Sequence, residues 1–569
     1  MSLQILVLLV KESRINRPIY IFRFPILRRL IITMRIRILL SALSLCISFI
    51  FLSPCFSQNK KLQDQLIIGL ESEPERLNPI TLKDPKTFKI AWQIYEGLLG
   101  LNEDGQVIPR IAEKWETKDN KTWVFHIRKN VAFHPSEIFD LPNKTRFVTA
   151  HDVLYSYTRF CSSESYSSFV LIDSIKGAKD FNAKKTDSVE GLTIIDDYTF
   201  QIELNEPEPF FINRITTSWI AIFPKEAEKE QFKDQWGLKI AVGTGPYRLV
   251  SKTDNEVVLV KNGNYWDNDR KPKIEKLVFR IIKNDQLRFT DLSKNRIDLM
   301  DIPNQSFPQI FNNDGAIKDE YKSNFVIKTA NTFNTHFIGM NLKKLPDRHL
   351  RRAMFYGTNR DEMVQKILYG YGEVMGGAVP PRMNGHIPLL KNIYNPQKAK
   401  WELKQSKYNG REIELLIHDL ANSEQIGQVF QKQMGDIGIK IKLVKLDFHS
   451  VIGKIVKGDT ELFNMFLEYV FSSPEPLLIN LFTTLKIPVP NFWNYSNKYV
   501  DQQLEKLRNL NDRSASVKNC AKIEKVIISG VPAIFLYRQK NVAIFSSKFK
   551  NLKINEHNHY MLEEMERVK

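Results

Sequence analysis

Cysteine is scarce in this sequence. Four cysteines occur in 569 residues, and two of them, Cys46 and Cys55, lie within the first 57 residues. The other two are Cys161 and Cys520, and the chain has no C-x-x-C pair or other metal-type cysteine cluster. Two alternatives stay open for Cys161 and Cys520: one disulfide in an oxidising compartment, or two unpaired buried thiols.

Familiar catalytic motifs are also missing. The chain contains no G-x-x-x-x-G-K-[ST] phosphate loop, no G-x-S-x-G nucleophile elbow and no H-E-x-x-H zinc helix. The glycine-rich stretch 370–377 follows a predicted helix rather than a strand, so we expect a flexible loop there. We interpret His557 and His559 as part of a solvated tail rather than half of a metal site. Because these motifs are absent, we expect the protein to be neither an enzyme nor the carrier of a bound cofactor.

Blocks of basic residues are absent from most of the chain, although the formal net charge is +18. Residues 1–57 carry eight basic residues and one acidic residue, whereas the remainder carries 74 and 63. In that remainder acidic and basic residues are interleaved, without a run of five or more basic residues. A nucleic-acid partner is therefore not expected.

Long apolar runs are likewise absent after residue 57. Before it, Met34-Arg35-Ile36-Arg37 is a short basic start, and residues 38–52 form an apolar run of about 15 residues, shorter than the roughly 20 that span a membrane. We predict a leader over residues 1–57, with the true start at Met34 and a signal peptide over residues 34–57. The alternatives of cleavage after Ser57 and lipid attachment at Cys55 stay open. Either one places the protein in the periplasm or another extracytoplasmic compartment.

The rest of the chain has the alternating patterns of a mixed α/β protein. Residues 123–127 alternate in the period-2 manner of a strand, and residues 149–152 form a capping box that opens a helix. Further on, strands at 413–417 and 439–444 flank a helix at 423–436, which is a β-α-β arrangement.

A series of short motifs, in order along nearly the whole chain after residue 57, resembles one family. The matching segments are Leu77-Asn78-Pro79, Tyr95-Glu96-Gly97-Leu98, residues 122–134, residues 149–153, Gly243-Thr244-Gly245-Pro246-Tyr247, Asn264-Tyr265-Trp266, Gly339-Met340-Asn341, Leu350-Arg351-Arg352-Ala353, Asn359-Arg360-Asp361 and Tyr394-Asn395-Pro396. Together they resemble the extracytoplasmic solute-binding proteins of ABC importers, in the class that binds oligopeptides, dipeptides and nickel.

The resemblance implies an α/β, two-lobed periplasmic-binding-protein fold, with an extra domain on the first lobe and a ligand cleft between the lobes. We expect the first lobe over residues 58–328, with the extra domain at about 91–220. The second lobe is expected over residues 329–530, and residues 531–569 return to the first lobe.

The resemblance also implies ligand-binding residues. Relatives hold the peptide's amino group with an aspartate in a W-x-x-D-Y stretch, and the corresponding stretch here is Met465-Phe466-Leu467-Glu468-Tyr469. Glu468 would take the place of the aspartate, because a buried ammonium group needs a paired carboxylate. Cleft-lining roles are further implied for the segments that contain Glu73 and Thr335-His336-Phe337.

We therefore predict a monomeric peptide-binding component of an ABC importer, which closes around an extended oligopeptide and delivers it to permease transmembrane subunits. The same scaffold binding a modified peptide, a metal chelate or haem is the alternative, because Glu468 and Met465 depart from the family pattern. An exported hydrolase is the alternative from a different class.

Overall fold

The computed structural model describes residues 64–568 except 217–218, 382, 384–385, 387–392, 421, 469–473, 509 and 511. The predicted leader, including Cys55, and the predicted site residue Tyr469 lie outside the described residues.

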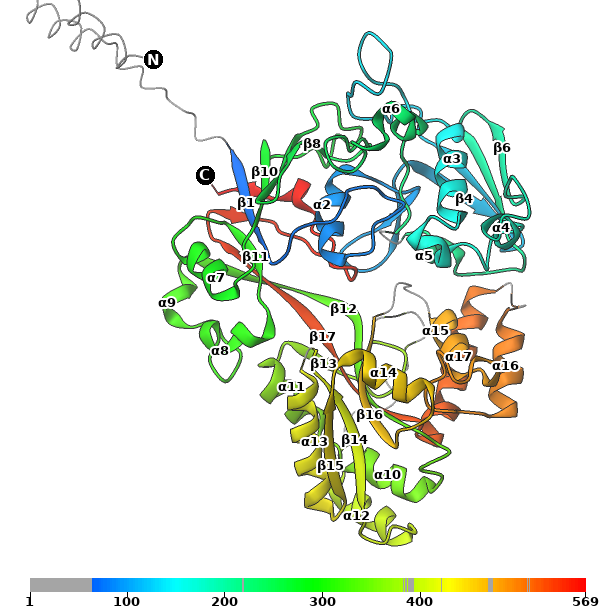
Figure 1. Cartoon of the computed structure of the whole chain (residues 1–569), viewed down its shortest axis with the longest axis vertical. Helices are drawn as coiled ribbons and strands as arrows, with labels where there is room; N and C mark the ends of the chain where they lie inside the picture. Colours follow the sequence, from blue (N-terminus) through cyan, green and yellow to red (C-terminus); the bar gives the residue numbers. More distant parts are fainter. Residues whose placement is uncertain are drawn as a thin grey trace, which may run out of the picture. The chain divides into compact units, whose positions relative to one another are not determined.

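One large mixed sheet dominates the described chain. Its strands, in spatial order, are β15 (Lys440–Leu446), β14 (Glu412–His418), β16 (Leu462–Glu468), β12 (Phe325–Met340), β17 (Ala533–Ser546), β11 (Leu299–Asp301), β1 (Gln65–Leu70), β10 (Lys276–Ile281), β9 (Glu256–Lys261) and β8 (Tyr247–Lys252), with β13 (Gly372–Val374) paired to β17. We call the part around β1 and β8–β11 the first lobe, and the part around β14–β16 the second lobe. Figure 1 shows the long strands β12 and β17 side by side, joining the two parts.

Smaller sheets lie in the first lobe. A four-stranded antiparallel sheet has the order β4 (Ala112–Thr117), β5 (Thr122–Ile127), β7 (Thr199–Glu203) and β6 (Leu192–Asp196). Two short pairs join β2 (Leu99–Leu101) to β3 (Val107–Pro109) and β18 (Phe549–Lys550) to β19 (Glu566–Arg567). The predicted capping box is present, since the Asp152 carboxylate accepts the Thr149 N–H at 2.9 Å, and it opens α3 (Ala150–Cys161).

The longer helices begin at side-chain caps in most cases. Asp84, Asn284, Asp347, Asn359, Asn395, Asp447 and Asp512 each accept hydrogen bonds from first-turn N–H groups. The helices of eight or more residues, besides α3, are α2 (Pro85–Ile94), α7 (Asp285–Ser293), α10 (Arg348–Gly357), α11 (Arg360–Leu368), α12 (Pro396–Gln405), α13 (Ser423–Ile437), α14 (Phe448–Val456), α15 (Pro474–Phe482), α16 (Lys498–Arg508) and α17 (Arg513–Gly530). Within the described ranges, no helix has both the length and the apolar character needed to cross a bilayer.

Hydrophobic cores lie in both lobes and leave a polar stretch between them. The first-lobe core includes Ala330 of β12, and the second-lobe cores include Phe337 of β12 and Tyr537 of β17. On β17 apolar packing resumes at Val542. Among the described residues, none between Ala330 and Phe337 on β12, or between Tyr537 and Val542 on β17, belongs to a core cluster. Apart from Phe333, the joining strands carry polar residues where they pass from one core to the other.

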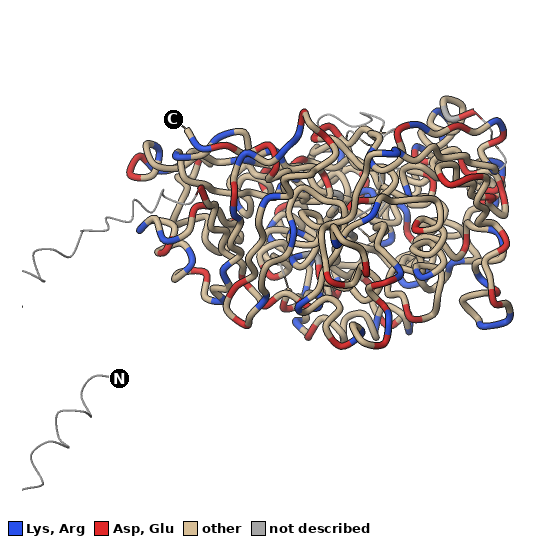
Figure 2. Tube along the Cα trace, turned by 90° about the horizontal axis from the view of Figure 1, so that it is seen from above, with Lys and Arg blue, Asp and Glu red and all other residues tan. Residues whose placement is uncertain are grey.

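One detail chooses between alternatives, one differs from expectation and one agrees with the sequence. Cys161 and Cys520 are both buried free thiols, and burial raises the pKa of Cys161 to about 12. The glycine-rich stretch is not wholly a loop, because Gly372 begins β13 and pairs with Gln539 of β17. Charges are interleaved over the folded chain as in the sequence, as Figure 2 shows.

A buried carboxyl group in the second lobe leads to a pH prediction. Glu524 of α17 is 1% exposed, its Oε1 accepts the Val379 N–H at 2.8 Å, and burial raises its pKa to about 7. Cys520 of the same helix lies near Glu524, because burial, Glu475 and Glu524 together raise the pKa of that thiol. The folded-state pKa lies above the ordinary value near 4.5. The folded state therefore loses stability relative to the unfolded state as the pH rises from about 4.5 to 7.

We expect Glu524→Gln to remove this loss. The melting temperature of the variant minus that of the natural protein should be higher at pH 8 than at pH 4.5, by the equivalent of a few kcal/mol, roughly 1.4 kcal/mol for each unit of pKa displacement. Thermal melts across that pH range measure it, with Glu461→Gln, an acid paired with the half-exposed Arg411, as the control. The prediction is contradicted if the melting temperatures of Glu524→Gln and the natural protein differ by the same amount at every pH.

Candidate functional site

Parallel strands in the second lobe end at one edge of the sheet. β14 is parallel to both β15 and β16, so the carboxyl ends of all three meet there, at His418, Leu446 and Glu468. β12 follows β16 in the sheet and runs antiparallel to it. In open α/β sheets, ligands bind outside the carboxyl ends of parallel strands. This edge is therefore the candidate ligand-binding edge of the second lobe.

The sequence-predicted Glu468 is the last residue of β16, opposite Asn334 of β12. Its position on the backbone is at this carboxyl edge. Thr335 and His336 lie one and two residues further along β12, opposite Leu467 and Phe466. The structure therefore brings three of the six predicted residues to neighbouring positions on paired strands.

His336 lies in an aromatic cluster. Its ring is 5.0 Å from the ring of Tyr537 and 5.7 Å from that of Phe466, measured between centroids. Burial, with the nearby His418, lowers the pKa of His336 to about 3, so the imidazole is neutral at physiological pH. Phe337 packs on the other side, with its ring 5.2 Å from that of Trp493 in a second-lobe core.

His418 is a site residue that the sequence analysis missed. Its Nδ1 accepts the Leu420 N–H at 3.2 Å, which places the proton on Nε2 in the neutral ring. The ring is 2% exposed, and neither its Nε2 nor the Thr335 hydroxyl has a hydrogen-bond partner among the described residues. The signal was present in the sequence, since a polar residue directly after a β-α-β strand lies at the carboxyl edge.

The first lobe has a corresponding edge. β1 is parallel to β10 and β11, and the predicted Glu73 follows the carboxyl end of β1 in an exposed loop. At the end of β11, the Asp301 carboxylate contacts the ammonium group of Lys89 and accepts a hydrogen bond from the Tyr560 hydroxyl. Lys89 is 5% exposed and Tyr560 is 2% exposed, so buried donors hold the partly exposed Asp301 in place.

The joining strands hold a buried arginine where they leave the cores. Arg538 is fully buried; its Nε donates to Glu373 of β13 at 2.9 Å, and its Nη1 donates to the Thr332 carbonyl at 3.3 Å. Glu556, from the segment after β18, lies 3.7 Å from Nη1. One guanidinium group therefore connects β17 and β12 with two carboxylates from different parts of the chain.

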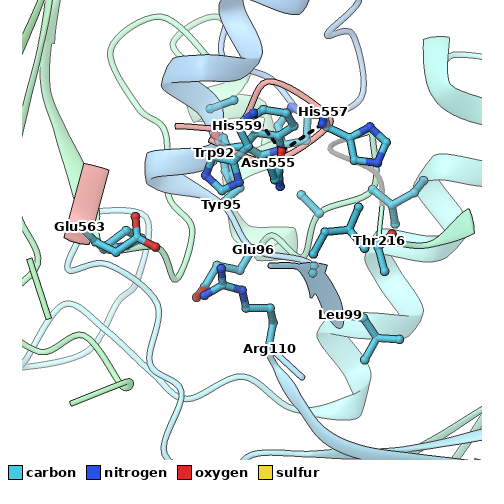
Figure 3. A pocket seen from close by; sticks show the side chains of 18 of the residues that line it. Trp92, Tyr95, Glu96, Leu99, Arg110, Thr216, Asn555, His557, His559 and Glu563 are labelled. Atoms are coloured by element: carbon cyan, nitrogen blue, oxygen red, sulfur yellow. Dashed lines mark hydrogen bonds and ion pairs between the residues drawn. The ribbon is translucent and has the colours of Figure 1, made fainter. Parts of the chain in front are cut away.

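A cavity of about 60 Å³ lies inside the first lobe (Figure 3). His557 and His559 line it, and the His559 ring is 4.4 Å from that of Trp92, so their assignment to a solvated tail is wrong. Glu96 accepts hydrogen bonds from the Tyr265 hydroxyl and the Trp266 indole, both at 2.8 Å. Within the described residues no three His, Cys, Asp or Glu side chains form a group suited to a metal ion. Ligand pockets occupy roughly 300–1,000 Å³, so this cavity is of a size for water.

Comparisons with known proteins agree with this arrangement. The family model "Bacterial extracellular solute-binding proteins, family 5 Middle" matches residues 106–487. The Dipeptide-binding protein of Escherichia coli strain K12 is 25% identical over 491 residues, which cover 83% of this chain and 88% of that protein. The periplasmic murein peptide-binding protein MppA of the same organism is 25% identical over 513 residues, which cover 87% and 91%. The structure of HbpA2 from Haemophilus parasuis superimposes with a TM-score of 0.76 at 22% identity, covering 89% of this chain and all of the other.

Proposed function

This chain belongs to the bacterial extracellular solute-binding proteins of family 5, and we propose that it is the peptide-binding component of an ABC importer. The family resemblance expected from the sequence motifs is confirmed, and so is the α/β two-lobed fold class. Proteins of this family bind substrates for transport and are not an enzyme family. For this chain, the absence of catalytic activity is part of the proposal.

The observation that supports a peptide ligand is the presence of two buried polar groups at the second-lobe edge. The His418 Nε2–H donor and the Thr335 hydroxyl have no partner among the described residues, and an unpaired buried polar group costs about 1–3 kcal/mol. An extended peptide offers a carbonyl or N–H group at every residue. Main-chain hydrogen bonds of this kind give affinity for many peptide sequences, as in strand addition.

The relatives support the same ligand class. Their names describe dipeptide-binding and murein peptide-binding proteins, and the latter is called periplasmic. The alternatives of a modified peptide, a metal chelate or haem, and the exported hydrolase, are favoured by no observation. Periplasmic localisation follows from these relatives; lipid attachment at Cys55, a permease partner and a monomeric state belong to the proposal.

Glu468 is proposed as the anchor for the peptide's amino group, with Tyr469, Glu73, His336 and Phe337 as further lining residues. We expect Glu468→Gln to weaken binding of a peptide with a free amino terminus by about tenfold or more, since charged hydrogen bonds contribute roughly 1.5–3 kcal/mol. N-terminal acetylation of the peptide should have a similar effect on the natural protein and little further effect on the variant.

Calorimetry with a library of short peptides, free and acetylated, measures both effects. The matched control is Glu461→Gln, which changes a glutamate just before the opposite end of the same strand, where it pairs with Arg411. If peptides bind but acetylation changes nothing, the Glu468 anchor is refuted while the peptide-binding function stands. If no peptide raises the melting temperature of the protein, the function itself is refuted.

A further inference from the structure

A second cavity lies in the second lobe, where the start of α10 meets the end of α17. Its volume is about 260 Å³. The residues that line it are Arg348, Arg352, Phe355, Tyr356, Lys525, Ile528, Ser529 and Val531. None of them belongs to the candidate ligand-binding edge described above. The cavity is therefore separate from the proposed peptide site.

The cationic side chains around the cavity are held in place by the protein. Arg348 donates from Nε and Nη2 to the Ser529 carbonyl, at 3.0 and 2.7 Å, which fixes the guanidinium group at the end of α17. The Nε of Arg352 lies 2.9 Å from an oxygen of Glu402. Lys525 is exposed and makes no ion pair with a described residue. Three positive groups thus border one concave surface.

In the described part of the chain, a carboxylate pairs with only one of the three cations, Arg352. Among the lining residues none is acidic, and the carboxylate that pairs with Arg352 is the fully buried Glu402. Glu402 is shared, because His349 Nδ1 lies 2.7 Å from its other oxygen. The solvent-facing side of the cavity therefore carries cations, while the compensating carboxylate lies beneath them.

The side chain of Tyr356 lies close to two of the positive groups in this region, Lys398 and Arg352. The Lys398 ammonium group is 4.0 Å from the centre of the Tyr356 ring, and the Arg352 guanidinium is 5.9 Å from it. Burial raises the pKa of Tyr356, but hydrogen bonds from Lys398 and Arg352 outweigh burial, so the pKa lies below its ordinary value. A negative charge is thus stabilised at this position.

The floor of the cavity is apolar, formed by Phe355, Ile528 and Val531. Arginine side chains match the planar geometry of carboxylates and phosphates, and an apolar floor favours a ligand with a hydrocarbon part. We propose that this cavity binds a small organic anion, whose oxyanion group lies against Arg348, Arg352 and Lys525 and whose apolar part lies on Phe355 and Ile528.

The test uses benzoate and inorganic phosphate as probes on the whole mature protein. We expect saturable benzoate binding at about millimolar concentration or tighter, with phosphate binding more weakly because it lacks the apolar part. The double variant Arg348→Gln, Lys525→Gln should weaken benzoate binding about tenfold or more. The control is Lys442→Gln, Lys445→Gln on β15, two exposed lysines that each pair with a glutamate; it should bind as the natural protein does.

Peptide competition separates this site from the proposed peptide site. A peptide that binds should not displace benzoate, and benzoate should still bind in Glu468→Gln. The proposal is overturned if benzoate does not saturate, if the cavity and control variants weaken binding equally, or if phosphate binds as tightly as benzoate. Displacement of benzoate by peptide also overturns it. Thermal melts verify that the double variant is folded, as expected for substitutions of exposed side chains.

Discussion

Arg538→Met is expected to destabilise the protein by about 3–5 kcal/mol, because it removes a fully buried cation from the acids that surround it. Glu373 loses the donor at 2.9 Å, and the 8%-exposed side chain of Glu556 loses a cation 3.7 Å away. The Thr332 carbonyl loses a hydrogen bond as well. Chemical denaturation with a circular dichroism signal measures the change in the free energy of unfolding.

Two further variants identify the cause of this loss. Replacing Glu373 by Gln in the Arg538→Met background should restore part of the stability, since it removes a carboxylate that no longer has its cation. Lys445→Met breaks an exposed ion pair with Glu424 and should change stability by less than about 1 kcal/mol. A loss of that small size in Arg538→Met would show that the buried ion pairs contribute no more than surface pairs.

Trp493→Ala is expected to cost a similar 3–5 kcal/mol in the second lobe, the range for removing a buried aromatic side chain. Trp493 is fully buried, and its ring lies 5.5 Å from that of Phe482 and 5.2 Å from that of Phe337. Its Nε1 also donates to the Leu481 carbonyl at 2.9 Å. The substitution therefore leaves a cavity and an unpaired carbonyl beneath β12.

Trp493→Phe is the matched control, because it keeps most of the apolar area and removes the indole donor. It should cost clearly less than Trp493→Ala. Denaturation curves of both variants, followed at the same pH, give the comparison. Equal losses in the two variants would assign the effect to the hydrogen bond rather than to packing.

Much of the fold could be predicted where the signals are local. The β-α-β arrangement expected at 413–417, 423–436 and 439–444 is present as β14, α13 and β15, with ends that differ by at most two residues. Alternating apolar residues and helix-capping side chains are read within a few residues of one another, so they survive in any tertiary context. The same locality explains why the capping box of α3 was identified.

Features that depend on distant partners could not be predicted. β12 begins at Phe325 and continues through an irregular stretch. Asn331 and Thr335 pair with β17 about 200 residues later, but the register shifts between them. The residues of that stretch have no alternating apolar pattern, so the pairing with β17 on either side of the shift could not be predicted from them. His557 and His559 became cavity-lining residues for the same reason, since Trp92 of α2 covers His559.

The strand order has a consequence for the synthesis of the chain. β17 is the seventeenth strand along the sequence, yet it lies in the interior of the large sheet, between β12 and β11. Until residues 533–546 have been made, both of those strands present an unpaired edge, which is the kind of surface that recruits other chains. The two halves of the molecule can thus begin to form in order, but the sheet that unites them is completed only when the last tenth of the chain arrives.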